Sequence, residues 1–301
     1  MGAGAVTETT FPAMGTEVTV LIDGHAQAHL ATTVRDLFLR WEETLSRFRP
    51  DSELSRVNAA GGDPAPAGPL LRSVTAEALR AAAATGGMFD PTLGGRMSAL
   101  GYGESLGAEW VVPRAALLGR HLPDGWRDVR VDDDAGTVSV PAGLALDLGG
   151  IAKGMAVDAA AEFLRGAGVR SALVSAGGDM RATGDSGGWQ VAFEDAPAEQ
   201  ITLTSGAVAT SSLSRRNWVH EGIRRHHLID PRTGLPARSG LRSASVAADT
   251  CVRAEVAAKT AFVLGRDRGA HFLERLGAPG LLTTTDGSVT RVGAWPESRD
   301  A

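Results

Sequence analysis

The stretch Asp147-Leu148-Gly149-Gly150-Ile151-Ala152-Lys153-Gly154 joins two different hydrophobic patterns, and the rest of the fold can be predicted outward from it. The apolar run at residues 144–148 predicts a buried strand that the two glycines end. The pattern at residues 151–165 predicts a helix, with Lys153 in its first turn. Free N–H groups at a helix start attract anions, so this corner is suited to a phosphate group. Taken alone, the motif is equally compatible with an ordinary corner that carries a surface lysine.

The segments on either side predict an α+β fold. Helical spacing of apolar residues predicts a helix at residues 30–45, and the alanine-rich run at residues 76–84 predicts a second. We expect two further helices at residues 252–264 and 270–276. Alternation and short apolar runs predict strands at residues 16–22, 172–174, 189–193, 201–204 and 243–247, and a hairpin of residues 129–131 with 137–140. Strands and helices do not alternate regularly, so we expect mixed, largely antiparallel sheets with packed helices.

Composition excludes several classes of function. The 301 residues carry a net charge of −5, and their 30 basic and 35 acidic residues are interspersed, which argues against binding to nucleic acid. The single cysteine, Cys251, excludes an internal disulfide and a thiolate zinc site. No apolar run is long enough to predict a membrane span. The first eight residues lack the basic and apolar regions of a signal peptide, so we expect a cytoplasmic protein, although a trimmed export signal stays possible.

Two further motifs carry polar residues beside turns. His227 begins the stretch His227-Leu228-Ile229-Asp230-Pro231-Arg232-Thr233-Gly234, and it is a candidate general base. A structural histidine is the commoner interpretation of a single His, and we expect Asp230 to shape the turn. Gly177-Gly178-Asp179 is typical either of a site for ribose or phosphate or of a tight turn.

Taken together and in order, seven short motifs resemble the FAD:protein FMN transferases, the ApbE or flavin-trafficking family. The motifs are Met14-Gly15-Thr16, the stretch from Ser46 to Leu54, Phe89-Asp90-Pro91-Thr92, the stretch from Asp147 to Gly154, Ala176-Gly177-Gly178-Asp179, Ala209-Thr210-Ser211 and the stretch from His227 to Gly234. The resemblance runs from about residue 11 to residue 265. It implies a single ApbE-like domain at residues 11–294, and we expect a flexible N-terminus at residues 1–10 and a tail at 295–301.

The resemblance implies an activity. Such enzymes cleave FAD at its pyrophosphate, attach FMN through a phosphoester to a threonine of a target flavoprotein, and release AMP. The acceptor threonine lies in a short Asp/Ser-Gly-Ala/Ser-Thr motif. Ser205-Gly206-Ala207 is followed by Val208, so modification of the chain by itself is not expected there. Two alternatives stay open, namely a protein that binds FAD without transfer and a pyrophosphatase that releases FMN and AMP.

The resemblance also implies roles for single residues. His227 would deprotonate the acceptor hydroxyl, and the Gly150 carbonyl would be a magnesium ligand. The residues implied to contact FAD are Met14 and Phe48 at the flavin, Met88, Phe89 and Asp90 at the nucleotide side, and Asp147, Lys153 and Thr210.

One late helix departs from the family pattern. The family has an Asp and a Thr there as magnesium ligands, and this chain has Glu255 and Lys259. Positions i and i+4 share a helix face. Three interpretations stay open. In the first, Glu255 binds the metal while Lys259 contacts phosphate, and in the second, Lys259 itself supplies the positive charge. In the third, the two side chains form only a helix ion pair, worth about 0.2–0.5 kcal/mol. Because an ammonium disfavours a nearby divalent ion, we expect a weakened or absent magnesium site, with Lys259 contacting FAD.

Overall fold

The computed structural model describes residues 6–24, 28–102, 122–184 and 187–296. The chain divides into two compact units, each built from separate segments. Unit 1 comprises Met1–Arg40, Lys153–Ser212 and Ser239–Ala301, and unit 2 comprises Trp41–Ala152 and Leu213–Arg238.

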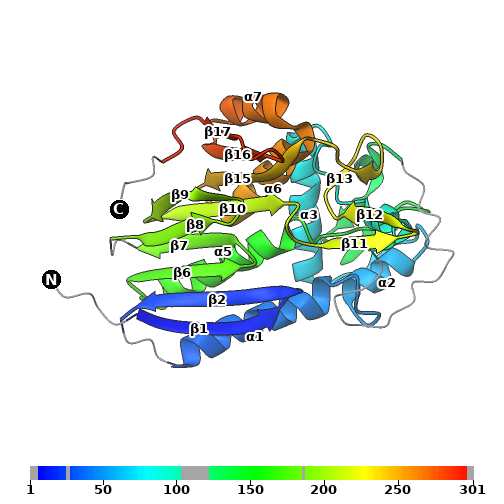
Figure 1. Ribbon diagram of the computed structural model, residues 1–301. Coiled ribbons are helices and arrows are strands. Elements are labelled where there is room, and N and C mark those ends of the chain that lie inside the picture. Colours follow the sequence, from blue (N-terminus) through cyan, green and yellow to red (C-terminus); the bar gives the residue numbers. More distant parts are fainter. Residues whose placement is uncertain (1–5, 25–27, 103–121, 185–186, 297–301) are drawn as a thin grey trace. The chain divides into compact units, whose positions relative to one another are not determined.

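Unit 1 is built on an eight-stranded sheet with the order β1-β2-β6-β7-β10-β15-β16-β17 (Figure 1). All neighbouring pairs in this sheet are antiparallel. The strands are β1 (Val6–Ala13), β2 (Thr16–Asp23), β6 (Ser171–Ala176), β7 (Asp179–Gly184), β10 (Gly206–Ser212), β15 (Leu241–Ala248), β16 (Gly280–Thr284) and β17 (Val289–Val292).

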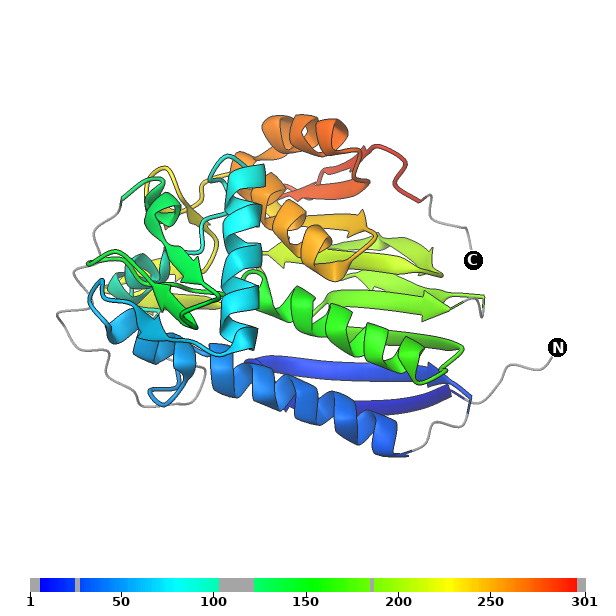
Figure 2. The same cartoon turned by 180° about the vertical axis from the view of Figure 1, so that it is seen from behind.

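Helices cover one face of this sheet. Figure 2 shows α1 (Ala28–Leu45), α5 (Ala152–Gly166) and α6 (Cys251–Leu264) on the same face, and α7 (Arg266–Leu276) contacts β16 and β17. The helix α6 is buried on nearly all sides, which explains why its sequence is apolar without a clear polar face. On the other side, the hairpin of β8 (Trp189–Phe193) and β9 (Ala196–Leu203) packs Val191 and Ile201 against Leu173 and Val208 of the sheet.

Unit 2 consists of short elements. Its helices are α2 (Glu53–Ala59), α3 (Pro69–Ala84), α4 (Gly94–Ala99) and the 3₁₀ turn η1 (Gly125–Asp128). A three-stranded sheet pairs β3 (Ala65–Pro66), β5 (Thr137–Ser139) and β4 (Arg130–Asp132) in that order. Two hairpins complete the unit, β11 (Asn217–His220) with β12 (Ile223–His226) and β13 (Ile229–Asp230) with β14 (Leu235–Pro236).

The predicted α+β class with largely antiparallel sheets is confirmed, and every predicted helix is present. The predicted strand at residues 144–148 is wrong, because only Ala145 pairs there, through one isolated parallel bridge to Leu93. Residues 6–10 were expected to be flexible but pair with β2, since a segment rich in β-branched residues suits a strand. Trp295, expected to begin a tail, is buried with its ring 5.4 Å from that of Phe193. None of the helices in the described ranges is both long and apolar enough to cross a membrane.

Candidate functional site

Two tight turns in unit 1 carry predicted site residues side by side. The turn between β1 and β2 contains Met14 (φ 53°) and Gly15 (φ 66°), and the turn between β6 and β7 contains Gly177 (φ 63°) and Gly178 (φ 96°). Positive φ at both central residues is typical of a type I′ hairpin turn. The N–H of Gly177 donates to the carbonyl of Glu17 at 3.1 Å, which joins the two turns. A methionine with positive φ is uncommon, so this turn holds Met14 in a conformation it does not prefer.

Lys153 lies between two buried carboxylates. Its ammonium is 2.8 Å from Asp179 Oδ2 and also contacts Glu255 Oε1. Both carboxylate side chains are only 5% exposed. The predicted phosphate-binding lysine is therefore held in one orientation by residues of β7 and α6.

The two carboxylates are also oriented by backbone groups. Glu255 Oε2 accepts a hydrogen bond from the Gly154 N–H at 2.9 Å, and Asp179 Oδ1 accepts one from the Thr210 N–H at 3.3 Å. Burial raises the pKa of Asp179, although the Lys153 ammonium acts in the opposite direction. The cluster thus holds two acidic groups against one basic group.

Two more predicted residues of unit 1 lie on the same elements. Thr210 is half-buried in β10, and its hydroxyl is 2.8 Å from that of Ser245 in β15. Lys259 is half-buried in α6, four residues after Glu255 and so on the same face of the helix.

Asp147 holds the glycine corner of unit 2. Its Oδ1 accepts a hydrogen bond from the Gly149 N–H at 2.8 Å, and its Oδ2 accepts one from Arg47 Nε at 2.6 Å. The Asp147 N–H donates to the carbonyl of Pro91 at 2.8 Å, so the motif containing Phe89 and Asp90 runs beside this corner.

The motif beside the corner is itself ordered. Phe89 is buried, and Met88 and Asp90 are half-buried. Asp90 Oδ1 accepts hydrogen bonds from the Thr92 N–H at 2.8 Å and the Thr92 hydroxyl at 2.6 Å. Gly150 is buried in the turn before α5.

Arg47, which the motifs did not single out as a site residue, organises an aromatic cluster around Phe48. Its guanidinium lies 4.2 Å from the Phe48 ring centroid and 5.0 Å from that of Tyr102, and it also donates to Ser98 and to the Tyr102 carbonyl. The Tyr102 ring stacks on Trp218 at 4.7 Å. Arg47 lies within the motif from Ser46 to Leu54, so that motif could have indicated a role for Arg47 in the site. No local sequence pattern indicates such a role for Trp218.

The two adjacent histidines of unit 2 differ. His227 is half-buried and follows β12 directly. His226 Nε2 is 3.2 Å from the carbonyl of Ala237, and burial lowers the pKa of His226. Asp230 accepts hydrogen bonds from the backbone N–H and the side chain of Arg232, both at 2.9 Å, which agrees with the predicted role in shaping the turn.

The residues in the late helix do not fit the magnesium site that the resemblance implies. Both oxygens of Glu255 already accept hydrogen bonds, from Lys153 and from the Gly154 N–H. A protonated lysine at position 259 has no lone pair with which to bind a metal. Within the described part of the chain, no group of three His, Cys, Asp or Glu side chains is arranged to hold a metal ion.

Residues 14–282 match the model of the ApbE family. The FAD:protein FMN transferase of Vibrio cholerae serotype O1 is 30% identical over 270 residues, which cover 86% of this chain and 80% of that protein. The ApbE protein from Thermotoga maritima superposes with a TM-score of 0.85 at 28% identity, covering 96% of this chain and 97% of that one. The flavin transferase ApbE from Vibrio cholerae gives a TM-score of 0.81 at 28% identity, over 97% and 98% of the two chains. The chain therefore belongs to the ApbE family.

Proposed function

We propose that this protein is an FAD:protein FMN transferase. In the reaction, the hydroxyl oxygen of an acceptor threonine forms a bond to the FMN phosphorus of FAD. The bond from that phosphorus to the oxygen of the AMP phosphate breaks, AMP leaves with the bonding electrons, and His227 takes the hydroxyl proton. Transfer of this kind depends mainly on positioning and on neutralising charge, with a base to assist the hydroxyl.

The observation that carries the proposal is the ordered glycine corner of unit 2. Asp147 and Arg47 fix the backbone at Gly149 in advance, so a pyrophosphate can bind without first ordering a loop. The loop of Phe89 and Asp90 lies against the same corner and is suited to the adenosine side of FAD. The relative from Vibrio cholerae that carries the same named activity supports this assignment.

The other contacts to FAD are assigned by the resemblance. We propose that Met14 and Phe48 contact the flavin, that Met88 contacts the nucleotide, and that Lys153 and Thr210 contact FAD. The buried carboxylates beside Lys153 support its role, because they hold its amino group in place.

We further propose that Lys259 supplies the charge that magnesium supplies in the family. The cluster of Lys153, Asp179 and Glu255 holds two acidic groups against one basic group, and Lys259 lies one helical turn from Glu255. The competing proposal keeps a magnesium ion at Glu255 and the Gly150 carbonyl, and requires Glu255 to exchange its present hydrogen bonds for the metal.

Mass spectrometry of an acceptor protein tests the transfer. The acceptor carries the Asp/Ser-Gly-Ala/Ser-Thr motif, and its matched control has alanine in place of the threonine. A mass gain equal to FMN on the first acceptor alone supports the proposal. Free FMN and AMP with an unmodified acceptor would identify a pyrophosphatase, and intact FAD would identify a binding protein.

We also propose that the partner of this protein is a flavoprotein that carries the acceptor motif. We propose that the reaction takes place in the cytoplasm.

A further inference from the structure

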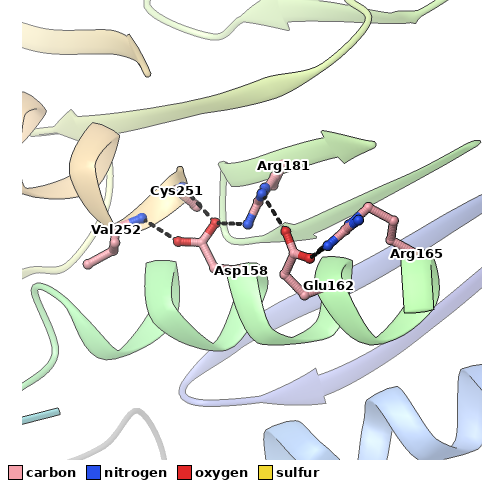
Figure 3. Close-up of polar contacts among 6 residues, drawn as sticks. All are labelled: Asp158, Glu162, Arg165, Arg181, Cys251 and Val252. Atoms are coloured by element: carbon pink, nitrogen blue, oxygen red, sulfur yellow. Dashed lines mark hydrogen bonds and ion pairs between the residues drawn. The ribbon is translucent and has the colours of Figure 1, made fainter. Parts of the chain in front are cut away.

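Three elements of unit 1 meet at two places. At the first place α5, β7 and α6 contribute Lys153, Asp179 and Glu255. At the second place the same elements contribute Asp158, Arg181 and the first N–H groups of α6 (Figure 3). The first place holds residues proposed to act on FAD, and the second lies outside every motif of the family resemblance.

Asp158 caps the helix α6 from another helix. Its Oδ1 accepts a hydrogen bond from the Cys251 N–H at 2.8 Å, and its Oδ2 accepts one from the Val252 N–H at 2.9 Å. Thr250, which has the sequence position and the extended backbone of an N-cap, makes no capping hydrogen bond with its side chain. The carboxylate therefore satisfies two N–H groups that the helix cannot satisfy itself, at the end where a negative charge is stabilising.

Arg181 holds this carboxylate against the sheet. One of its terminal nitrogens is 3.0 Å from Asp158 Oδ1, and the other is 2.7 Å from Glu162 Oε1. Asp158 and Glu162 are four residues apart, so the guanidinium of one β7 residue spans two successive turns of α5, as Figure 3 shows. The side chain of Arg181 is 16% exposed and that of Asp158 is 15% exposed, so water screens this pair little.

The face of α5 that carries Asp158 also makes a close approach to α6. Gly154 lies four residues before Asp158, and a Cβ added there would be 2.9 Å from both the N and the Cα of Val252. Val252 therefore lies between Gly154, where only a glycine fits, and the carboxylate of Asp158, which accepts a hydrogen bond from the Val252 N–H. Glu255 and Lys259 follow one and two turns further along the same helix.

The polarity of the two places fixes the register between the helices. At the first place α5 contributes the cation and α6 a carboxylate, whereas at the second place α5 contributes the carboxylate and α6 the positive helix end. A slip of α6 by one turn that moved Glu255 to the position of Cys251 would bring it against Asp158, and like charges repel.

We infer that Asp158 and Arg181 are positioning residues for FMN transfer, which set the location of Glu255 and Lys259 relative to Lys153. The inference rests on the proposed function. A displacement of about 1 Å from a residue far from the reacting atoms can cost about a hundredfold in rate. Because charge develops as the bond to AMP breaks, the misplaced ammonium groups should affect kcat more than FAD binding.

The test compares Asp158→Asn and Arg181→Lys with Asp249→Asn. Asp249 pairs with Arg253 near the start of α6 but is 91% exposed, so its variant removes the same charge without loosening the helix. Transfer kinetics, FAD affinity by fluorescence titration and melting temperature are measured on the full chain, well below the lowest melting temperature. We expect kcat to fall about 10- to 100-fold in the first two variants and FAD affinity to fall by less, about three- to tenfold, with Asp249→Asn unchanged.

A purely structural role predicts a different result. It lowers the melting temperature of Asp158→Asn and Arg181→Lys but leaves kcat and FAD affinity of the folded protein at the wild-type values, and that result would overturn the inference. The double variant Asp158→Asn with Glu255→Gln adds a second criterion, because residues that act through one another have non-additive effects. Additive losses would also count against the inference.

Failure of the proposed function gives a separate result. A wild-type protein that binds FAD but transfers no FMN contradicts the proposed function and leaves the FAD titration as the test. Weaker FAD binding in Asp158→Asn and Arg181→Lys but not in Asp249→Asn then supports the positioning role, and equal affinity in all three overturns it.

Discussion

Gly154→Ala should destabilise this protein, although alanine is ordinarily the better residue in a helix. In an open position the substitution gains about 0.8–1.0 kcal/mol from helix propensity. At Gly154 the new Cβ would be 2.9 Å from Glu255 Oε2 and from the N and Cα of Val252. Two of those three atoms belong to the backbone, so a side-chain rotation cannot relieve the contact. Overpacking of this kind costs about 1–3 kcal/mol.

The balance predicts a loss of up to about 2 kcal/mol in the free energy of unfolding, which corresponds to a melting temperature lower by up to about 8 °C. The matched control is Gly166→Ala at the end of the same helix, where a Cβ meets nothing within 4 Å. That variant should be as stable as the wild type or slightly more stable. Denaturant unfolding followed by circular dichroism measures both values. Equal stability of the two variants would refute the close approach of α5 and α6 at Gly154.

Four other outcomes follow from the site. His227→Ala should lower the transfer rate by about 10²–10⁴ and leave FAD binding intact, and unchanged transfer would remove its role as the base. Lys153→Ala should weaken FAD binding markedly by calorimetry, and wild-type affinity would contradict its placement. FAD should bind nearly as well in EDTA as with magnesium, and Lys259→Thr with Glu255→Asp should create a dependence on magnesium; loss of wild-type binding on chelation would restore an ordinary metal site. Burial lowers the pKa of His226, so the unfolded chain takes up a proton first and stability should fall as pH drops below about 6.5, whereas His226→Gln should flatten that slope in denaturant titrations.

Local pattern was sufficient for the helices of unit 1 and insufficient for the strand at residues 144–148. Apolar spacing predicted α1 because this helix buries one face that the sequence itself defines, whereas α6 was recognisable because an almost wholly apolar run of helical length is buried on nearly all sides. The run at residues 144–148 is equally apolar, but Leu146 and Leu148 are buried without a neighbouring strand, and their backbone is satisfied by other groups. The side chain of Asn58 makes hydrogen bonds with both the N–H and the carbonyl of Leu146. An apolar run indicates that its side chains are buried, but it does not indicate which groups form hydrogen bonds with its backbone.

The interactions that order the candidate site join residues far apart in the chain. Arg47 and Asp147 are 100 positions apart, and Asp158 and Cys251 are 93 positions apart. Thr250 illustrates the difficulty, because its residue type and position predict a capping side chain, yet the cap comes from Asp158. No periodicity within one segment contains that information. Most of the motif residues were found because they lie in short stretches with glycines or prolines that mark turns, whereas Thr210, Glu255 and Lys259 came from the family resemblance alone.

The discontinuous sheet of unit 1 has a consequence for synthesis on the ribosome. In the finished sheet β10 lies between β7 and β15, but β15 is made only after residues 213–240, which belong to unit 2. A nascent chain that ends near Ser212 therefore presents the unpaired backbone of β10 along one edge, where another chain can pair with it. Truncations between β10 and β15 should be prone to aggregation, and the full chain should fold slowly, because its central strand pairing waits for distant residues.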